Sequence, residues 1–334
     1  MAGQSAVILG LEGPVLGRDE AAFFRAANPY GFILFARNIT DPVQLTALTA
    51  DLRACVGADV PVLIDQEGGR VQRMRAPHWR EWLPPLEQAA LASDPIRAAW
   101  LRARIMAAEL RACGVDANCA PTCDIAGALT HPFLRNRCWG EDVATVIPQA
   151  RATMDGFLAG GVLPIVKHMP GHGRATNDSH HDLPTVTASA DDLRAQDFAV
   201  FKALSDAPMG MTAHIRFTAF DEAPATQSAA MIELIRKEIG FNGLLMTDDI
   251  AMQALAGSIA ERSALAIKAG CDVVLHCNGM RAEAEAAVEA SGTLTGAALA
   301  RSEAALTARC TPAAIDIDAL DAEFGSVLGQ GLHG

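Results

Sequence analysis

Short apolar segments recur along the chain, and each is followed by polar residues or glycine and then by a longer amphipathic segment rich in alanine and leucine. Candidate strands of this kind occupy residues 6–11, 31–37, 60–65, 115–121, 162–168, 209–215, 243–249 and 271–277. They are apolar nearly throughout, which is typical of parallel strands buried on both faces of a sheet. The alternation of such strands with helices predicts a parallel α/β fold.

The polar residues that follow the strands distinguish a closed barrel from an open, doubly wound sheet. An open sheet would concentrate its binding residues at one switch point. Here polar clusters follow many of the strands, as expected when the loops converge on the C-terminal mouth of a (β/α)8 barrel. We therefore expect one TIM-type (β/α)8 barrel domain spanning residues 1–334, with residues 280–334 forming C-terminal helices packed on the barrel.

Composition narrows the possible partners and compartments. Half of the 334 residues are hydrophobic and 20% are charged, so the chain can bury a large core and disorder is not expected. The net charge of −12 argues against nucleic acid or an anionic membrane surface as a partner. The N-terminus lacks the basic region and long apolar core of a signal peptide, and no apolar run reaches the roughly 18 residues of a membrane span. We expect a cytoplasmic protein.

The segment "KHMPGHGRATNDSHHDLP", residues 167–184, concentrates ionisable groups on one irregular stretch. A metal site, a solvated loop and a proton-transfer site are the three interpretations. Metal-dependent hydrolases on this barrel usually begin with His-x-His at the first strand, which here ends in "LEGPVLG", and Cys119 and Cys123 have no second matched pair. A loop longer than about twelve residues is usually functional or disordered. Asp178 and His180 lie two apart, so in an extended segment the carboxylate could orient the imidazole for proton transfer.

Further polar residues stand at the ends of the other predicted strands. Each of them alone is weak evidence, because a carboxylate at a strand end is often a helix cap or a salt-bridge partner. Their convergence on one barrel mouth is a stronger indication of a site. They are Asp65, Glu67, Arg70 and Arg73 after the third strand, Arg137 in the loop after the fourth, Lys167 and His168 at the fifth, His214 at the sixth, and Asp248 and Asp249 at the seventh.

At these motifs the sequence resembles the family 3 β-N-acetylglucosaminidases, single-domain barrel enzymes of bacterial peptidoglycan recycling. The resemblance lies in "IDQEGGRVQR", "RCWGED", "KHMPGHG" followed by "DSHHDLP", and "TDDIAM", and it extends over nearly the whole chain. Met169 stands where the family usually has phenylalanine, a change that roughly conserves volume. Asn136 and Cys138, on either side of Arg137, also depart from the usual residues.

The resemblance implies a mechanism and a set of roles. Asp248 would be the nucleophile that forms a covalent glycosyl-enzyme, and His180, paired with Asp178, would be the acid/base. Asp249 would be structural and cap a helix beginning at Ile250. The substrate contacts would be Asp65, Arg73, Arg137, Lys167 and His168.

The expected activity is that of a retaining exo-β-N-acetylglucosaminidase acting on GlcNAc-containing muropeptide fragments, without a metal or an organic cofactor. A broader β-glycosidase, a metal-dependent hydrolase and a non-catalytic sugar-binding barrel are the alternatives. His214 is as compatible with a core position as with a role behind the site.

Overall fold

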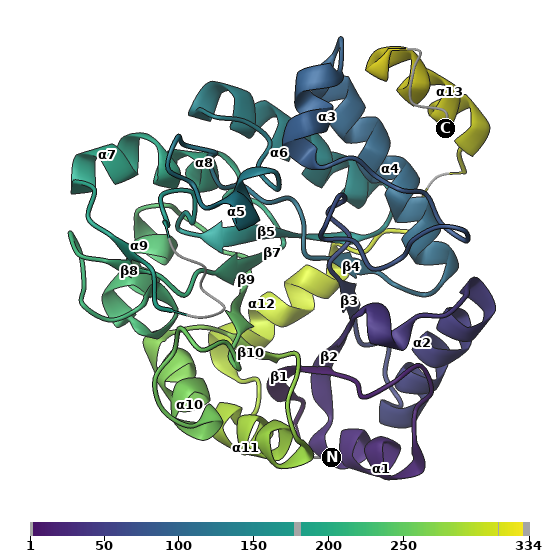
Figure 1. Ribbon diagram of the computed structural model, residues 1–334. Coiled ribbons are helices and arrows are strands. Elements are labelled where there is room, and N and C mark those ends of the chain that lie inside the picture. Colours follow the sequence, from purple (N-terminus) through teal and green to yellow (C-terminus); the bar gives the residue numbers. More distant parts are fainter. Residues whose placement is uncertain (1–2, 177–181, 313, 330–334) are drawn as a thin grey trace.

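The computed structural model describes residues 3–176, 182–312 and 314–329 (Figure 1). Within these residues, eight parallel strands close into a barrel in the order β1-β10-β9-β7-β5-β4-β3-β2. The predicted TIM-type (β/α)8 fold is confirmed. The barrel strands are β1 (Ser5–Gly10), β2 (Pro29–Leu34), β3 (Val62–Ile64), β4 (Ala117–Asn118), β5 (Leu163–Met169), β7 (Met209–Thr212), β9 (Leu244–Asp249) and β10 (Val273–His276).

Helices surround the barrel, and local sequence signals fix where several of them begin. In α2 and α4 an aspartate N-cap precedes a proline at the first helical position: Asp41 accepts from the Val43 and Gln44 N–H groups, and Asp94 accepts from the Arg97 N–H group. The helices are α1 (Arg18–Ala27), α2 (Pro42–Val56), α3 (Pro85–Leu91), α4 (Pro95–Ala112), α5 (Pro132–Arg135), α6 (Val143–Ala159), α7 (Ala190–Ala195), α8 (Asp197–Ala203), α9 (Ala229–Lys237), α10 (Ile259–Ala269), α11 (Arg281–Ser291), α12 (Gly296–Thr307) and α13 (Ile317–Leu328).

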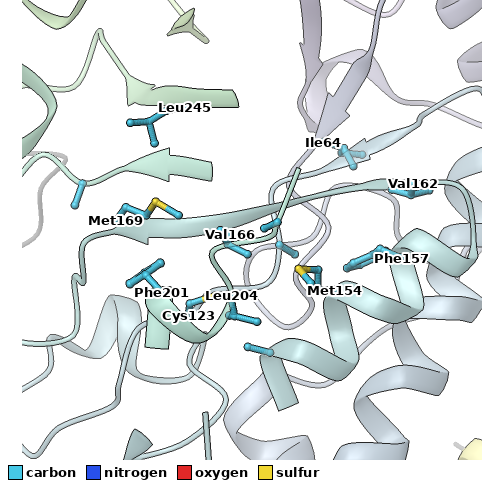
Figure 2. Close-up of a cluster of buried hydrophobic side chains, with 14 of the residues drawn as sticks. Ile64, Cys123, Met154, Phe157, Val162, Val166, Met169, Phe201, Leu204 and Leu245 are labelled. Carbon is cyan, nitrogen blue, oxygen red and sulfur yellow. The ribbon is translucent and has the colours of Figure 1, made fainter. Parts of the chain in front are cut away.

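The hydrophobic core has two layers, one inside the barrel and one between the strands and the helices. Along β5, Leu163 and Ile165 belong to the inner cluster, whereas Val166 and Met169 belong to the outer one. Figure 2 shows part of the outer layer, where the side chains of β5 meet residues of α6 and α8 such as Phe157 and Phe201. The residues of one strand thus serve both layers, which explains why the strands are apolar nearly throughout.

The C-terminal helices contact the barrel in different ways. Helix α13 packs on α4 (Figure 1). Its Phe324 ring also meets the ring of Trp82, in the segment before α3, with centroids 5.6 Å apart. Helix α12 contributes Ala305 to the inner cluster, and Leu294 just before it joins the same cluster. Because the Leu294 N–H group donates to the carbonyl of Gln4, just before β1, this segment closes the N-terminal end of the barrel. The predicted site residues lie at the opposite end of the barrel, where the C-terminal ends of the strands meet.

A buried carboxylate attaches α12 to the barrel. Asp272, at the start of β10, is 3% exposed and accepts from Arg301 of α12 at 2.5 and 2.9 Å. It also accepts from Arg236 at 2.7 Å and from the Leu245 N–H group at 2.9 Å. No helix in the described part of the chain is long and apolar enough to cross a lipid bilayer.

We expect Asp272→Asn to lower the free energy of unfolding by about 2–4 kcal/mol, because it leaves two guanidinium groups without their shared counter-charge. Urea denaturation measures the loss. Glu233→Gln is the control, since it breaks the exposed Lys237–Glu233 pair (2.6 Å), which water and salt screen, and should leave stability nearly unchanged. Equal effects of the two variants would contradict the anchoring role of Asp272.

Candidate active site

A pocket of about 310 Å³ opens at the C-terminal ends of the barrel strands. Its lining comes from segments far apart in the chain, as the convergence of the barrel loops predicts. Six of the predicted site residues line it together: Asp65, Arg73, Arg137, Lys167, His168 and Asp248. The other two, Asp178 and His180, lie outside the described residues.

A cluster of alternating charges forms one wall of the pocket. The Lys167 ammonium lies 2.9 Å from Asp65 Oδ1 and 2.5 Å from Glu67 Oε1. Arg137 makes a two-pronged contact with Glu67 at 2.8 and 2.9 Å, and Arg73 Nη2 lies 3.1 Å from Asp65 Oδ2. Such bidentate, charge-assisted bonds fix both position and orientation.

Burial and neighbouring positive charges shift the pKa values of the acids in this cluster in opposite directions. Burial alone would raise the pKa of Asp65, but Lys167 and Arg73 outweigh it and hold that pKa well below its usual range. For Glu67, burial is likewise outweighed, by Arg137 and Lys167, and the pKa falls to about 2. In turn Asp65 and Glu67 offset the desolvation of Lys167 and raise its pKa. All members of the cluster are therefore charged near neutral pH.

Glu67 follows the third predicted strand, and its role is not evident from the sequence. The structure shows it buried beneath the cations that line the pocket, where it positions Arg137 and Lys167. The motif "DQEGGRVQR" contains two acids, and a sequence pattern does not tell which one enters the pocket and which one lies beneath it.

Asp124 is a second positioning residue that the sequence analysis did not assign. Its Oδ2 lies 2.7 Å from His168 Nδ1, and its Oδ1 accepts from the His172 N–H group at 2.6 Å. This contact fixes the imidazole and directs His168 Nε2 toward Arg137, whose Nη2 is 3.5 Å away. The His172 ring meets His168 edge-on at 5.3 Å, and burial, followed by the charge of His168, lowers the pKa of His172 to about 4.

Asp248 and Asp249 both line the pocket but differ in their contacts. Asp248 Oδ1 accepts from the Asp249 N–H group at 2.8 Å, and no cation of the described chain lies within ion-pair distance of its carboxylate. Burial would raise the pKa of Asp248, but His168, His214 and that N–H group together lower it. Asp248 is thus an ionised carboxylate with free lone pairs.

The Asp249 carboxylate accepts hydrogen bonds from the backbone of two separate segments. Its Oδ1 accepts from the Ala251 and Cys277 N–H groups, each at 3.1 Å. The expected helix starting at Ile250 is wrong, because residues 250–257 form turns. Asp249 closes the first of these turns and joins it to the end of β10, instead of capping a helix.

His214 has partners for both ring nitrogens. Its Nε2 donates to the Asp249 carbonyl at 3.0 Å, and Nδ1 lies 2.7 Å from Thr226 Oγ1. Burial lowers its pKa. His214 is therefore a fully bonded core residue that supports the backbone on which Asp248 and Asp249 stand.

Comparison with known proteins identifies the family. The glycosyl hydrolase family 3 N-terminal domain profile matches residues 18–307. The chain belongs to glycosyl hydrolase family 3. The family predicted from the motifs is confirmed, and so is the prediction that the protein is a glycoside hydrolase.

Relatives in the family match over most of their length. The β-hexosaminidase of Bordetella avium is 36% identical over 282 residues, which are 81% of this chain and 80% of that protein. The β-hexosaminidase of Vibrio cholerae is 37% identical over 287 residues, 84% of each chain.

Solved structures agree with the fold. A family 3 β-N-acetylglucosaminidase from Paenibacillus superposes with a TM-score of 0.85 at 30% identity, covering 93% of this chain and 63% of that one. NagZ from Neisseria gonorrhoeae, crystallised with N-trifluoroacetyl-D-glucosamine, superposes with a TM-score of 0.79 at 28% identity, covering 98% and 99% of the two chains.

In the part of the chain that the structure describes, no group of three or more His, Cys, Asp or Glu side chains could hold a metal ion. Cys119 and Cys123 are fully buried thiols whose pKa is raised well above the usual value, first by burial and then by nearby carboxylates.

Glu67 should make stability depend on pH. Its pKa is depressed from 4.5 in the unfolded chain to about 2 in the folded one. Its contribution is therefore complete above pH 4.5 and is lost as the pH falls toward 2. We expect Glu67→Gln to cost about 2–3 kcal/mol of unfolding free energy at pH 7, and less as the pH is lowered, because protonated Glu67 resembles glutamine.

Urea unfolding at several pH values from neutral to acidic measures this difference. Glu81→Gln is the control, since Glu81 and Arg75 form an exposed pair at 2.7 Å. A cost of Glu67→Gln that does not change with pH would contradict the assignment.

Proposed function

We propose that this protein is a retaining exo-β-N-acetylglucosaminidase that removes terminal GlcNAc from peptidoglycan (muropeptide) fragments in cytoplasmic cell-wall recycling. The coarser assignment, a β-N-acetylhexosaminidase, is supported by the family match and by relatives of that activity at 36–37% identity. The cell-wall substrate and the compartment are supported by the resemblance of the sequence motifs to recycling enzymes.

The observation that carries the proposal is the state of Asp248. Among the described residues, three carboxylates line the pocket, and two of them are engaged: Asp65 by Lys167 and Arg73, and Asp249 by two backbone N–H groups. Asp248 has a lowered pKa and, within the described residues, accepts only from the Asp249 N–H group, so it keeps lone pairs free to attack a sugar, which suits a nucleophile. We assign it to attack the anomeric carbon and form the glycosyl-enzyme as the bond to the leaving oxygen breaks.

A retaining glycosidase needs a second group that gives a proton to the leaving oxygen and later takes one from water. We assign this role to His180, with Asp178 as its partner. In the first step the His180 imidazolium protonates the leaving sugar. In the second step neutral His180 deprotonates the water that attacks the anomeric carbon, and Asp248 leaves as a carboxylate.

The remaining lining residues would recognise the sugar. Asp65 accepts hydrogen bonds from hydroxyl groups, and Lys167, Arg73, Arg137 and His168 donate to hydroxyl or acetamido oxygens. The charge cluster holds these groups in place before substrate arrives. Substrate binding therefore costs little side-chain conformational entropy.

The first test separates the two catalytic roles. Asp248→Asn should severely reduce activity on every substrate. His180→Ala should release nitrophenol from an aryl GlcNAc in a burst followed by slow turnover, because nitrophenolate leaves without a proton but hydrolysis of the intermediate needs the base. Losing the acid/base should cost about 10²–10⁴ in each step that it assists.

Intact-protein mass after reaction of His180→Ala should show a sugar attached to Asp248. Asp178→Ala should give a milder version, because the imidazole remains without its orienting partner. An equal slowing of aryl and natural substrates, with neither burst nor adduct, would assign the proton transfer to another group.

The second test concerns the acetamido group. Aryl β-GlcNAc should be preferred over aryl β-glucoside by about 30- to 1000-fold in kcat/KM, because a site built for the acetamido oxygen leaves buried donors unpaired without it. Equal kcat/KM values on the two glycosides would exclude this specificity and favour a broader β-glycosidase.

A further inference from the structure

A second cavity of about 310 Å³ adjoins the active-site pocket. It is lined by residues at the ends of β1 and β10 and by residues of α1 and α11, which flank these two strands (Figure 1). The two cavities share Cys277 and Asn278 in their walls. A volume of this size is at the lower end of the range for pockets that hold small molecules. The catalytic steps proposed for Asp248 and His180 do not use this second cavity.

Glu20 brings a carboxylate to this cavity without a cation to balance its charge. The residue is 8% exposed, and its Oε1 accepts from the Glu12 N–H group at 2.9 Å. Within residues 3–176, 182–312 and 314–329, no Lys, Arg or His nitrogen lies within 4.0 Å of the Glu20 carboxylate oxygens. Burial raises the pKa of Glu20. A buried carboxylate in this state favours a ligand that brings a positively charged group.

Arg37 brings a positive charge to the same cavity. Its Nε, Nη1 and Nη2 atoms donate to the Leu11 carbonyl at 2.7 Å, to Asn278 Oδ1 at 2.6 Å and to the Cys277 carbonyl at 2.8 Å. None of these acceptors in the described chain is a carboxylate, and each terminal nitrogen keeps a further N–H group. The contacts hold the guanidinium in place, so its remaining N–H groups are ready to bind an anionic group.

A neutral ring and apolar side chains complete the lining of the cavity. His276 is 4% exposed, and its Nε2 has no hydrogen-bond partner in the part of the chain that the structure describes. Burial lowers the pKa of His276, so near neutral pH its ring is uncharged and can donate or accept a further hydrogen bond. Leu11, Phe23 and Met280 offer apolar contacts.

We propose that this cavity binds a free α-amino acid with an apolar side chain, its ammonium group on Glu20 and its carboxylate on Arg37. A ligand with a carboxylate alone would leave Glu20 without a counter-charge, and an amine alone would leave Arg37 without one. An α-amino acid carries both charges on one carbon and pairs both groups at once, while its side chain covers the apolar lining. This site is separate from the one proposed for GlcNAc.

The test measures binding of L- and D-leucine to the whole protein by isothermal titration calorimetry. We expect at least one enantiomer to bind. Its N-acetyl derivative lacks the ammonium charge and its amide lacks the carboxylate, so each should bind about 10- to 100-fold more weakly, in line with the loss of one charge-assisted contact.

Variants of the lining test the two assigned contacts. Glu20→Gln keeps an acceptor for the Glu12 N–H group but loses the charge, and it should raise the Kd for leucine about 10- to 100-fold. Arg37→Gln should have a similar effect, and Arg37→Lys a smaller one. Asp19→Asn and Arg18→Gln are the matched controls, because both residues are exposed on α1 outside the lining, and they should leave the Kd unchanged. A Tm close to that of the wild type in the absence of leucine shows that each variant is folded.

Three outcomes would overturn the inference: no binding of either enantiomer at millimolar concentration, equal Kd values for leucine and its two derivatives, or an unchanged Kd in Glu20→Gln. Asp248→Asn should bind leucine as tightly as the wild type, and a loss of binding there would place the amino acid in the active-site pocket instead. Hydrolysis of aryl β-GlcNAc tests the proposed function separately, because the calorimetric result does not depend on catalysis.

Discussion

The four-membered contact of Asp65 and Glu67 with Lys167 and Arg137 is the constraint on which the site depends. Each of these groups is costly to bury alone, and each is charged because its neighbours are charged. They come from β5 and from the loops after β3 and β4, so the cluster also fixes three loops relative to one another. The conformational entropy of the Lys167 and Arg137 side chains is lost when the chain folds. Substrate binding therefore does not have to order them.

This arrangement divides the acids of the barrel mouth into two kinds. Glu67 and Asp124 lie beneath the surface and hold side chains in orientation, while Asp248 has no cation partner in the described part of the chain. His214 donates a hydrogen bond to the Asp249 carbonyl, next to Asp248, and so supports the end of the strand. A carboxylate tied to a cation loses nucleophilicity, so the lack of a cation partner within the described residues is consistent with the nucleophilic role proposed for Asp248.

The sequence was sufficient for the fold and for six of the residues that line the pocket. Apolar strands alternating with helices predicted the barrel, and motifs at strand ends predicted Asp65, Arg73, Arg137, Lys167, His168 and Asp248, which the structure brings together. The roles of Glu67 and Asp124 were not predictable, because burial beneath a partner from another strand depends on tertiary packing. The expected helix after Asp249 was also wrong: its bond to the Cys277 N–H group depends on β10, almost thirty residues away.

The closure of the barrel has a consequence for how the protein is made. The first strand, β1, pairs with the last, β10, and the Leu294 segment that seals the barrel floor binds the backbone just before β1. During synthesis the N-terminal strand therefore leaves the ribosome long before its partner exists, with one edge unpaired and the inner face uncovered. Such an edge invites association with other chains. The edge of β1 that faces β10 therefore stays open to such association until the chain has been made as far as Leu294.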